Sequence, residues 1–266
     1  QVALLILAAL ALPLFPFHGV YIAALTRAPG YSPVVLALLL PTIGLYGLSI
    51  LPGGLPGEVL RATGVLALSG ALYGSFKALA QVRMADLLAY ASLAFYSVVW
   101  WHFAVIGRMP LASLVYVAAL ALLTAGVLLA ALRLRRRYGA LTLERMHGLA
   151  RPMPRFAAVF ALLVMGFVGL PPFGLFSSHV EMLLQPALAL SPSLAVIVLS
   201  WFLASWYLFR MMQRLLFGPH RSDLRYEDLR AHELGYFIAL LVILAVLGGA
   251  PFVVLESGLM LDVGRA

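Results

Sequence analysis

The sequence predicts an all-α polytopic membrane protein with about nine transmembrane helices. Of its 266 residues, 64% are hydrophobic and only 11% are charged, whereas a soluble domain is about 45–50% apolar and about 25% charged. The mean hydropathy of +1.03 points the same way. Inside lipid, only helices and closed barrels satisfy their own backbone polar groups. The length of the apolar runs favours helices over the short strands of a barrel.

Apolar runs between polar breaks give the expected helices in chain order. The first half of the chain supplies 2–17, 32–51, 62–81 and 86–107. The second half supplies 111–133, 155–171, 173–190, 193–216 and 234–258. The run 2–17 is short for a helix that must cross about 30 Å of hydrocarbon. It begins at the second residue of the chain, so we expect residues of this span to precede the sequence.

Two breaks between these runs are rich in proline. The stretch "LPGGLPGE" (51–58) predicts a turn between two helices. In "GLPPFGLF" (169–176), Pro171 and Pro172 separate two apolar runs, and proline interrupts helical hydrogen bonding. We expect either a discontinuous helix, of the kind that exposes backbone groups in transporters, or an ordinary tight loop between two helices.

Basic residues account for a formal net charge of +8, and they gather in the segments between apolar runs. That distribution is typical of membrane topology and excludes a nucleic-acid partner. The loop 133–155 contains one acid, Glu144, and seven arginines: Arg133, Arg135, Arg136, Arg137, Arg145, Arg151 and Arg155. The positive-inside rule therefore predicts that this loop faces the cytoplasm.

The sequence contains no cysteine, so it offers no disulfide and no thiolate ligand for an iron–sulfur cluster. It also lacks histidine pairs at metal-binding spacing, a P-loop, a dinucleotide-binding glycine motif and an HExxH motif. We expect no catalytic residue, no metal and no cofactor on this chain, and hence no redox centre of its own.

Ionisable residues inside apolar runs are functional candidates, because a charge is costly to bury in hydrocarbon. Lys77, the only lysine, falls late in 62–81 and either exchanges protons or extends to the membrane surface. His179 and Glu181 follow the proline pair and are candidates for a proton path. Two residues apart, they point about 200° away from each other on a helix. His102, after "VVWW", is expected at the membrane interface.

Four stretches carry a family resemblance. They are "PLFPFHGVYIAALTRAP" (13–29), "YGSFKALAQVRMADLLAYASLAFYSVV" (73–99), "HGLARPMPRFAAVFALLVMGFVGLPPFGLF" (147–176) and the closing segment from "FRMMQRLLFGP" (209–219) onward. In this order they resemble the antiporter-like proton-translocating membrane subunits of respiratory complex I, closest to chain M or subunit 4. The resemblance covers nearly the whole chain.

The sequence departs from that family at its proton carriers. Aligning Ala28–Pro29 and Tyr46–Gly47 places the family's helix lysine at Thr42, whose hydroxyl has no charged state near neutral pH. The family's helix histidine falls on Leu120. The charged residue after the Gly-Leu-Pro break falls on His179, or on Glu181 with a shift of two residues.

The resemblance implies a fold of about fourteen helices with inverted repeats, of which this chain corresponds to the C-terminal part. The whole chain then forms one membrane domain, with a remnant of the first repeat at about 1–81, the second repeat at about 86–216 and a terminal helix at 234–258. The N-terminal helices are either missing from the sequence or supplied by another chain.

The function implied is that of a membrane-arm subunit of a complex-I-type NADH:quinone oxidoreductase. Such a translocase subunit couples electron transfer in its partners to proton translocation, here with a degenerate proton path. Its expected partners are other membrane-arm subunits and the lipid bilayer, with quinone reached only through the complex, in a prokaryotic plasma membrane. The alternatives are a non-pumping structural subunit, or a subunit of a membrane-bound hydrogenase, a multisubunit cation/proton antiporter or an inorganic-carbon uptake complex.

Overall fold

The computed structural model describes residues 2–51, 55–139, 147–184, 192–218 and 226–256, and these ranges contain helices but no strand. The helices are α1 (Val2–Ala11), α2 (Gly19–Arg27), α3 (Ser32–Ser49), α4 (Gly57–Leu79), α5 (Met84–Ile106), α6 (Leu111–Tyr138), α7 (Pro154–Val168), α8 (Gly174–Leu183), α9 (Pro192–Leu216) and α10 (Ala231–Glu256). The predicted all-α fold is confirmed. Six helices of the described chain are long and apolar enough to cross a membrane: α3, α4, α5, α6, α9 and α10.

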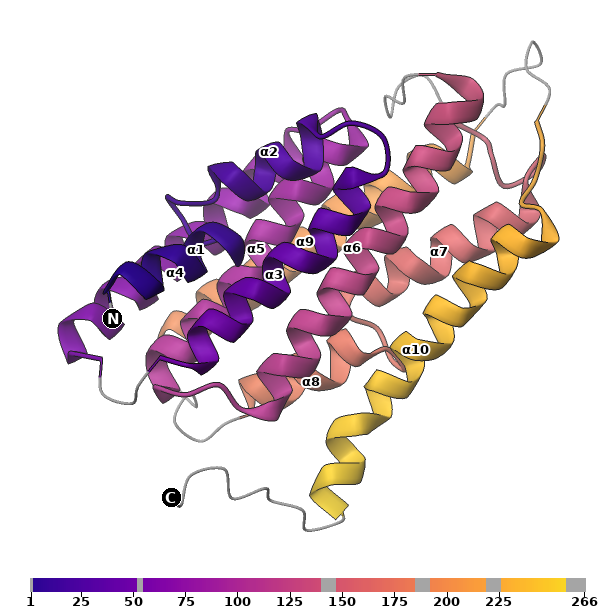
Figure 1. Cartoon of the computed structure of the whole chain (residues 1–266). Helices are drawn as coiled ribbons and strands as arrows, with labels where there is room; N and C mark the ends of the chain where they lie inside the picture. The colour runs from indigo at the N-terminus through magenta and orange to yellow at the C-terminus, as the bar shows by residue number, and fades with distance from the viewer. Residues whose placement is uncertain (1, 52–54, 140–146, 185–191, 219–225, 257–266) are drawn as a thin grey trace.

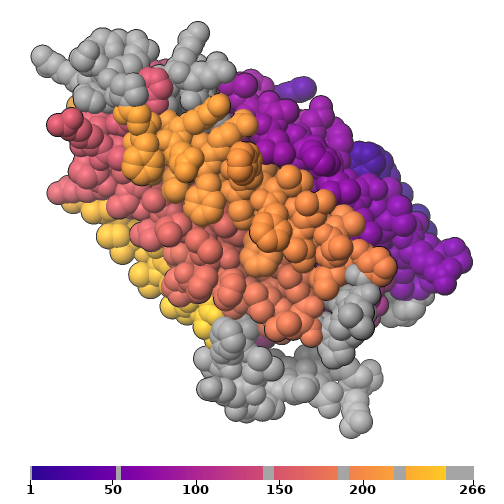
Figure 2. All heavy atoms as spheres, turned by 180° about the vertical axis from the view of Figure 1, so that it is seen from behind, coloured from indigo at the N-terminus to yellow at the C-terminus, as the bar shows by residue number. Residues whose placement is uncertain are grey.

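The helices form an elongated bundle whose longest members run along a common direction (Figure 1). Helices α5 and α6 lie at its centre, because 78% and 72% of their most apolar windows are buried inside the protein. Helix α10 runs along one edge. On the face turned away from the viewer in Figure 1, α9 lies between α4 and α7 (Figure 2). The exposed side chains of α9 include Phe202 and Trp206. Such apolar outer surfaces suit a bundle surrounded by hydrocarbon.

Small residues set the spacing between α4 and α5, the most extensively packed pair of helices. A Cβ atom added to Gly74 would lie 2.8 Å from both the amide nitrogen of Ala94 and the carbonyl oxygen of Tyr90. One turn earlier, a Cβ on Gly70 would lie 2.6 Å from Ser97 Oγ. Glycine therefore lets the two backbones approach as closely as the small-residue interfaces of membrane helices do.

The bundle contains two interrupted helices rather than the single interruption that the sequence predicts. The expected break at 169–176 is confirmed, since α7 ends at Val168 and α8 begins at Gly174. The expectation of one helix over 2–17 is wrong. Helix α1 ends at Ala11, and a turn holding Pro13 and Pro16 leads into the short helix α2.

Each interruption leaves backbone carbonyls without a helical partner, and in each case a tryptophan supplies a donor. Trp100 of α5 donates its indole N–H to the carbonyl of Leu12 at 3.0 Å, just after α1. Trp201 of α9 donates its indole N–H to the carbonyl of Val168 at 2.6 Å, at the end of α7. At each interruption, therefore, one free carbonyl is satisfied by a side chain of the protein.

One end of the bundle is held by charged groups. Glu233, at the start of α10, is paired with Arg133 at 3.0 Å and with Arg137 at 2.9 Å, both from the last turns of α6. Asp228 accepts hydrogen bonds from the backbone N–H groups of Arg155 and Phe156 at 2.9 and 3.0 Å, and so caps the start of α7. Part of the predicted arginine-rich loop thus joins α6, α7 and α10, while residues 140–146 lie outside the described chain.

Candidate functional site

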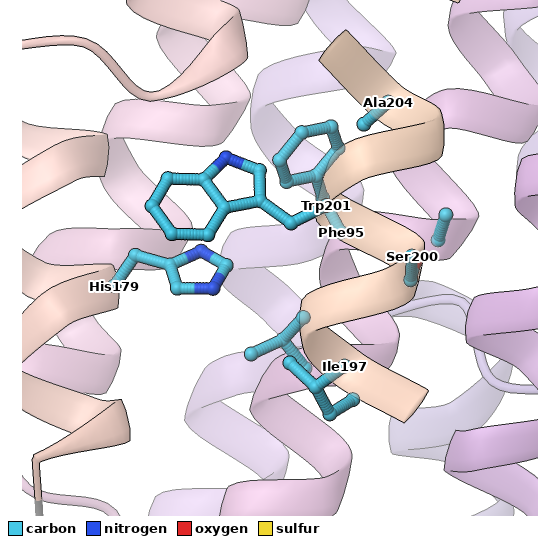
Figure 3. Close-up of a pocket in the computed structure, with 8 residues that line it drawn as sticks. Phe95, His179, Ile197, Ser200, Trp201 and Ala204 are labelled. Atoms are coloured by element: carbon cyan, nitrogen blue, oxygen red, sulfur yellow. The ribbon is translucent and has the colours of Figure 1, made fainter. Parts of the chain in front are cut away.

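His179 lies in the first turns of α8, directly after the proline interruption, and its side chain is buried in the bundle. Its imidazole stacks on the indole of Trp201, with ring centroids 4.5 Å apart and an interplanar angle of 23° (Figure 3). On another side it contacts Tyr116 of α6, at a centroid distance of 5.5 Å. Elements distant in sequence thus enclose one titratable group.

A cavity of about 10 Å³ adjoins this histidine, lined by side chains of α5 and α9 that include Phe95, Ser200 and Trp201 (Figure 3). Its volume is about what one water molecule requires. The Nε2 atom of His179 is buried and makes no hydrogen bond within the described chain. A neutral imidazole offers one donor and one acceptor, so this ring has unused capacity to accept or release a proton.

A pair of serine hydroxyls continues from the cavity toward α4. Ser200 of α9 lies 3.0 Å from Ser75 of α4, oxygen to oxygen. Ser200 also donates to the carbonyl of Ala71 at 3.3 Å. Both serines are buried, so α4 and α9 meet here through a polar contact inside the bundle.

Lys77 does not join this site. It lies in the last turn of α4 with an exposed side chain, and its ammonium is 5.8 Å from the ring centroid of Tyr73. Gln81 donates from its side chain to the carbonyl of Lys77 at 3.0 Å. A position near the helix end, beside an aromatic ring, fits a lysine that extends to the membrane surface, one of the two expectations from the sequence.

Glu181 shares α8 with His179 but is only half-buried, while His179 faces the interior. The predicted separation of the two side chains around the helix agrees with this difference. Within the described chain, neither Glu181 nor Lys77 forms an ion pair. The three proton-path candidates from the sequence therefore do not form one cluster, and whether they act together stays a prediction.

The two positions where the family's carriers are replaced differ in location. Thr42 is exposed on the outer side of α3, and its hydroxyl donates to the carbonyl of Leu38 in its own helix at 2.7 Å. Leu120 is fully buried in α6, where its carbonyl accepts a hydrogen bond from Thr124 at 2.8 Å. Neither position holds a group that titrates near neutral pH.

His102 was expected at the membrane interface, and the structure shows that its side chain does not face the outside of the bundle. The side chain is fully buried between α5 and α6, with Nδ1 3.3 Å from Ser113 Oγ. Its Nε2 atom, like that of His179, has no hydrogen-bond partner in the described chain. The "VVWW" pattern suggested an interfacial belt, but Trp100 and Trp101 are themselves buried and bonded inside the protein.

Charged groups are scarce in the interior of the described chain. Its buried acids are Asp86 and Glu233, and both lie in the first turn of a helix beside arginines. No group of three histidine, aspartate or glutamate side chains in the described ranges is placed to hold a metal ion. The interior polar groups are instead histidines, tyrosines, serines and threonines.

These features define a helical membrane protein of the transporter-like kind, in which an interrupted helix places a titratable side chain inside the bundle. Residues 1–205 match the family described as NADH:quinone oxidoreductase/Mrp antiporter, transmembrane. The chain belongs to this family. The match includes both interrupted helices, His179 and Trp201.

Individual relatives agree with that assignment. The chain is 28% identical over 252 residues to NADH-quinone oxidoreductase subunit M of Mycobacterium tuberculosis, covering 92% of this chain and 45% of the relative. It is 34% identical over 186 residues to subunit 13 of the Thermus thermophilus enzyme, covering 68% of this chain and 38% of the relative. The chain thus spans less than half the length of these relatives.

Solved structures share the fold. A chain of respiratory complex I from Thermus thermophilus superposes with a TM-score of 0.81 at 26% identity, covering 94% of this chain and 54% of that one. A chain of the Mrp complex from Dietzia sp. superposes with a TM-score of 0.79, covering 94% of this chain and 56% of that one. At 19% identity the second likeness concerns the fold alone.

Proposed function

We propose that this chain is a membrane-arm subunit of a complex-I-type NADH:quinone oxidoreductase, and that it moves protons while its partner subunits transfer electrons. Family membership and the names of its relatives support this proposal. The observation that carries it is the place of His179, a buried imidazole with a free ring nitrogen directly after a helix interruption.

His179 is the proton carrier in this proposal. Its ring accepts a proton at one nitrogen and releases one from the other, so proton transfer across it needs no movement of the backbone. The stacked indole of Trp201 holds the ring plane in place. Lys77, exposed at the end of α4, serves at the periphery, where it meets lipid headgroups or a carboxylate of a neighbouring subunit. Glu181, half-buried on another face of α8, is a further candidate for the proton path.

The remaining parts of the proposal follow from the assembly. The partners are the other membrane-arm subunits, embedded with this chain in a bacterial plasma membrane. Quinone and redox cofactors belong to those partners. This chain contributes only a path for protons and structural support. In this proposal the chain is the C-terminal part of an antiporter-like subunit; it spans less than half of the relatives it matches.

A second function, a non-pumping subunit that seals and spaces its neighbours, is favoured by one observation. The positions that carry the family's lysine and histidine hold Thr42 and Leu120, and the interior of the described chain contains no lysine. Under that reading His179 is a packed side chain whose loss leaves proton transport unchanged.

The test begins with purification of the native complex and identification of the subunits that accompany this chain. Flavin-, iron–sulfur- and quinone-module subunits are expected, whereas hydrogenase subunits would contradict the proposal. The complex is then reconstituted in vesicles, and protons translocated per electron are measured. His179→Gln should lower the ratio, whereas the control His232→Gln, at an exposed position on α10, should not. An unchanged ratio with His179→Gln would favour the non-pumping subunit.

A further inference from the structure

The outer face of α9 changes from aromatic to basic near the end of the helix. Phe202 and Trp206 have exposed fractions of 72% and 69%, and Arg210 and Arg214 follow at intervals of four residues. Residues four apart are neighbours on one helix face, so these four side chains form a single stripe, here called the α9 stripe. The stripe belongs to the side of the bundle where α9 lies between α4 and α7 (Figure 2).

Arg210 is half-buried and has no counter-ion within the described chain. Its Nη2 donates to the carbonyl of Leu79, at the end of α4, at 3.0 Å. Its Nε is buried and has no hydrogen-bond partner among the described residues. No carboxylate of those residues pairs with Arg210 or with the exposed Arg214. An arginine removed from water is almost always paired, because an unpaired charge is costly to desolvate. The arrangement therefore indicates an anion from outside the described chain.

The basic end of the α9 stripe reaches the headgroup layer of a bilayer. Helix α9 has 25 residues and is about 38 Å long, whereas the hydrocarbon layer is about 30 Å thick. At its end the carbonyl of Leu216 accepts a hydrogen bond from the N–H of Ala150 at 2.9 Å, beside the start of α7. This is the arginine-rich end of the bundle, which is predicted to face the cytoplasm, where anionic lipids make the membrane surface negative.

We propose that the α9 stripe binds an anionic phospholipid. The phosphodiester lies against Arg210 and Arg214, and the acyl chains lie along Trp206 and Phe202. A guanidinium has five N–H donors, and Arg210 uses one of them on the Leu79 carbonyl. Enough donors remain for paired hydrogen bonds to two phosphate oxygens. The inference goes beyond the proposed function and holds whether or not the chain pumps protons.

Other basic residues at this end do not share the site. Arg133 and Arg137 already have Glu233 as their counter-ion. Lys77 lies two residues before Leu79 on α4 and therefore points about 200° away from it around the helix. The two arginines of the α9 stripe have no such acid in the described chain, so the lipid phosphate supplies the charge that balances them.

The test uses tryptophan fluorescence of the purified full chain in vesicles of phosphatidylcholine and phosphatidylglycerol, with bromine on the acyl chains of one lipid at a time. Bromine quenches a tryptophan that it contacts. Trp206 is the reporter, because Trp100 and Trp101 are buried and Trp201 stacks on His179 inside the bundle. Titration of each brominated lipid gives the preference of the site for phosphatidylglycerol over phosphatidylcholine. Trp206→Phe should remove the lipid-dependent quenching and so verifies the reporter.

In the wild type, phosphatidylglycerol should quench more strongly than phosphatidylcholine at the same mole fraction. Arg214→Gln removes only an exposed charge and should lower the preference by about fivefold, the effect of one arginine near an anionic surface. Arg210→Gln should lower it at least as much. The control is Arg135→Gln, which makes the same charge change at an exposed position on α6, at the same end of the bundle.

Each outcome decides the proposal. Equal quenching by the two lipids in the wild type overturns it, and a carboxylate of another subunit then becomes the counter-ion of Arg210. A preference that survives both Arg210→Gln and Arg214→Gln also overturns it. If Arg135→Gln lowers the preference as much as Arg214→Gln does, the attraction comes from the overall charge of this end and not from the stripe. If Arg210→Gln does not fold, Arg214→Gln decides alone. All these failures leave the proposed function standing.

Discussion

The indole of Trp201 stacks on the imidazole of His179 with a centroid distance of 4.5 Å, and the same indole donates its N–H to the carbonyl of Val168 at 2.6 Å. One side chain of α9 therefore contacts the end of α7 and the buried histidine of α8. The position of the titratable ring and the shape of the interruption are coupled through this tryptophan.

Replacing Trp201 by phenylalanine should loosen this coupling. The smaller ring still stacks, but the carbonyl of Val168 loses its donor, and an unsatisfied buried carbonyl costs about 1–3 kcal/mol. We expect a lower midpoint of thermal unfolding in detergent. Trp206→Phe is the matched control, because Trp206 lies on the same helix and is 69% exposed. Equal effects of the two substitutions would show that the Val168 hydrogen bond does not stabilise the fold.

Gly248→Ala should destabilise the packing of α10 on the proline interruption. A Cβ atom at Gly248 would overlap the carbonyl oxygen of Pro172, which is backbone and cannot turn away. Overpacking of this kind costs about 1–3 kcal/mol. At the neighbouring Gly249 a Cβ meets nothing within 4 Å, so Gly249→Ala should be neutral or stabilise the helix by up to about 1 kcal/mol. Comparing the unfolding midpoints of the two variants tests the contact, and a stable Gly248→Ala would contradict it.

Glu233→Gln should weaken the junction between α6 and α10. The carboxylate is 4% exposed and pairs with Arg133 and Arg137, and a hydrogen bond to a charged group contributes about 1.5–3 kcal/mol. We expect faster proteolysis near the start of α10 and a lower unfolding midpoint. Glu58→Gln is the control, since its pair with Arg61 at 3.7 Å is exposed on both sides and exposed pairs contribute little. Identical behaviour of the two variants would refute the junction.

Lys77→Ala tests the peripheral role of the single lysine. If Lys77 exchanges protons, protons translocated per electron should fall while the complex assembles normally. If it only anchors α4 at the surface, the ratio should stay at the wild-type value, because the side chain is exposed and its ammonium lies beside the ring of Tyr73. Gln81→Ala, one turn further along, removes a neighbouring polar side chain and serves as the control for local disturbance.

The fold was largely predictable from the sequence, because the lengths of apolar runs report membrane spans directly. The run 86–107 became α5, Met84–Ile106, and 193–216 became α9, Pro192–Leu216. The interruption at Pro171–Pro172 was visible because two adjacent prolines stand between apolar segments. The earlier interruption was missed because Pro13 and Pro16 lie near the start of the sequence, in a run already expected to be short.

The interior polar groups could not be predicted from the sequence in the same way. Lys77 drew attention as the only lysine, yet its side chain lies on the outside of α4. His102, Tyr21 and Tyr96 are fully buried because of how α2, α5 and α6 face one another. In apolar helices that face is not marked by an amphipathic pattern, so the sequence offers no periodic signal to reveal it.

The tryptophan caps on the two interruptions bear on the electrical behaviour of the membrane. Irregular backbone at membrane depth is tolerated only where it is buried in protein or lines a water-filled cavity, and a continuous column of water would let ions through. At Leu12 and Val168, indole N–H groups take the place of that water. These two carbonyls therefore need no water inside the bundle, which favours its acting as an insulator. A membrane that stores energy as a voltage depends on such a barrier, because every leaked charge lowers that voltage.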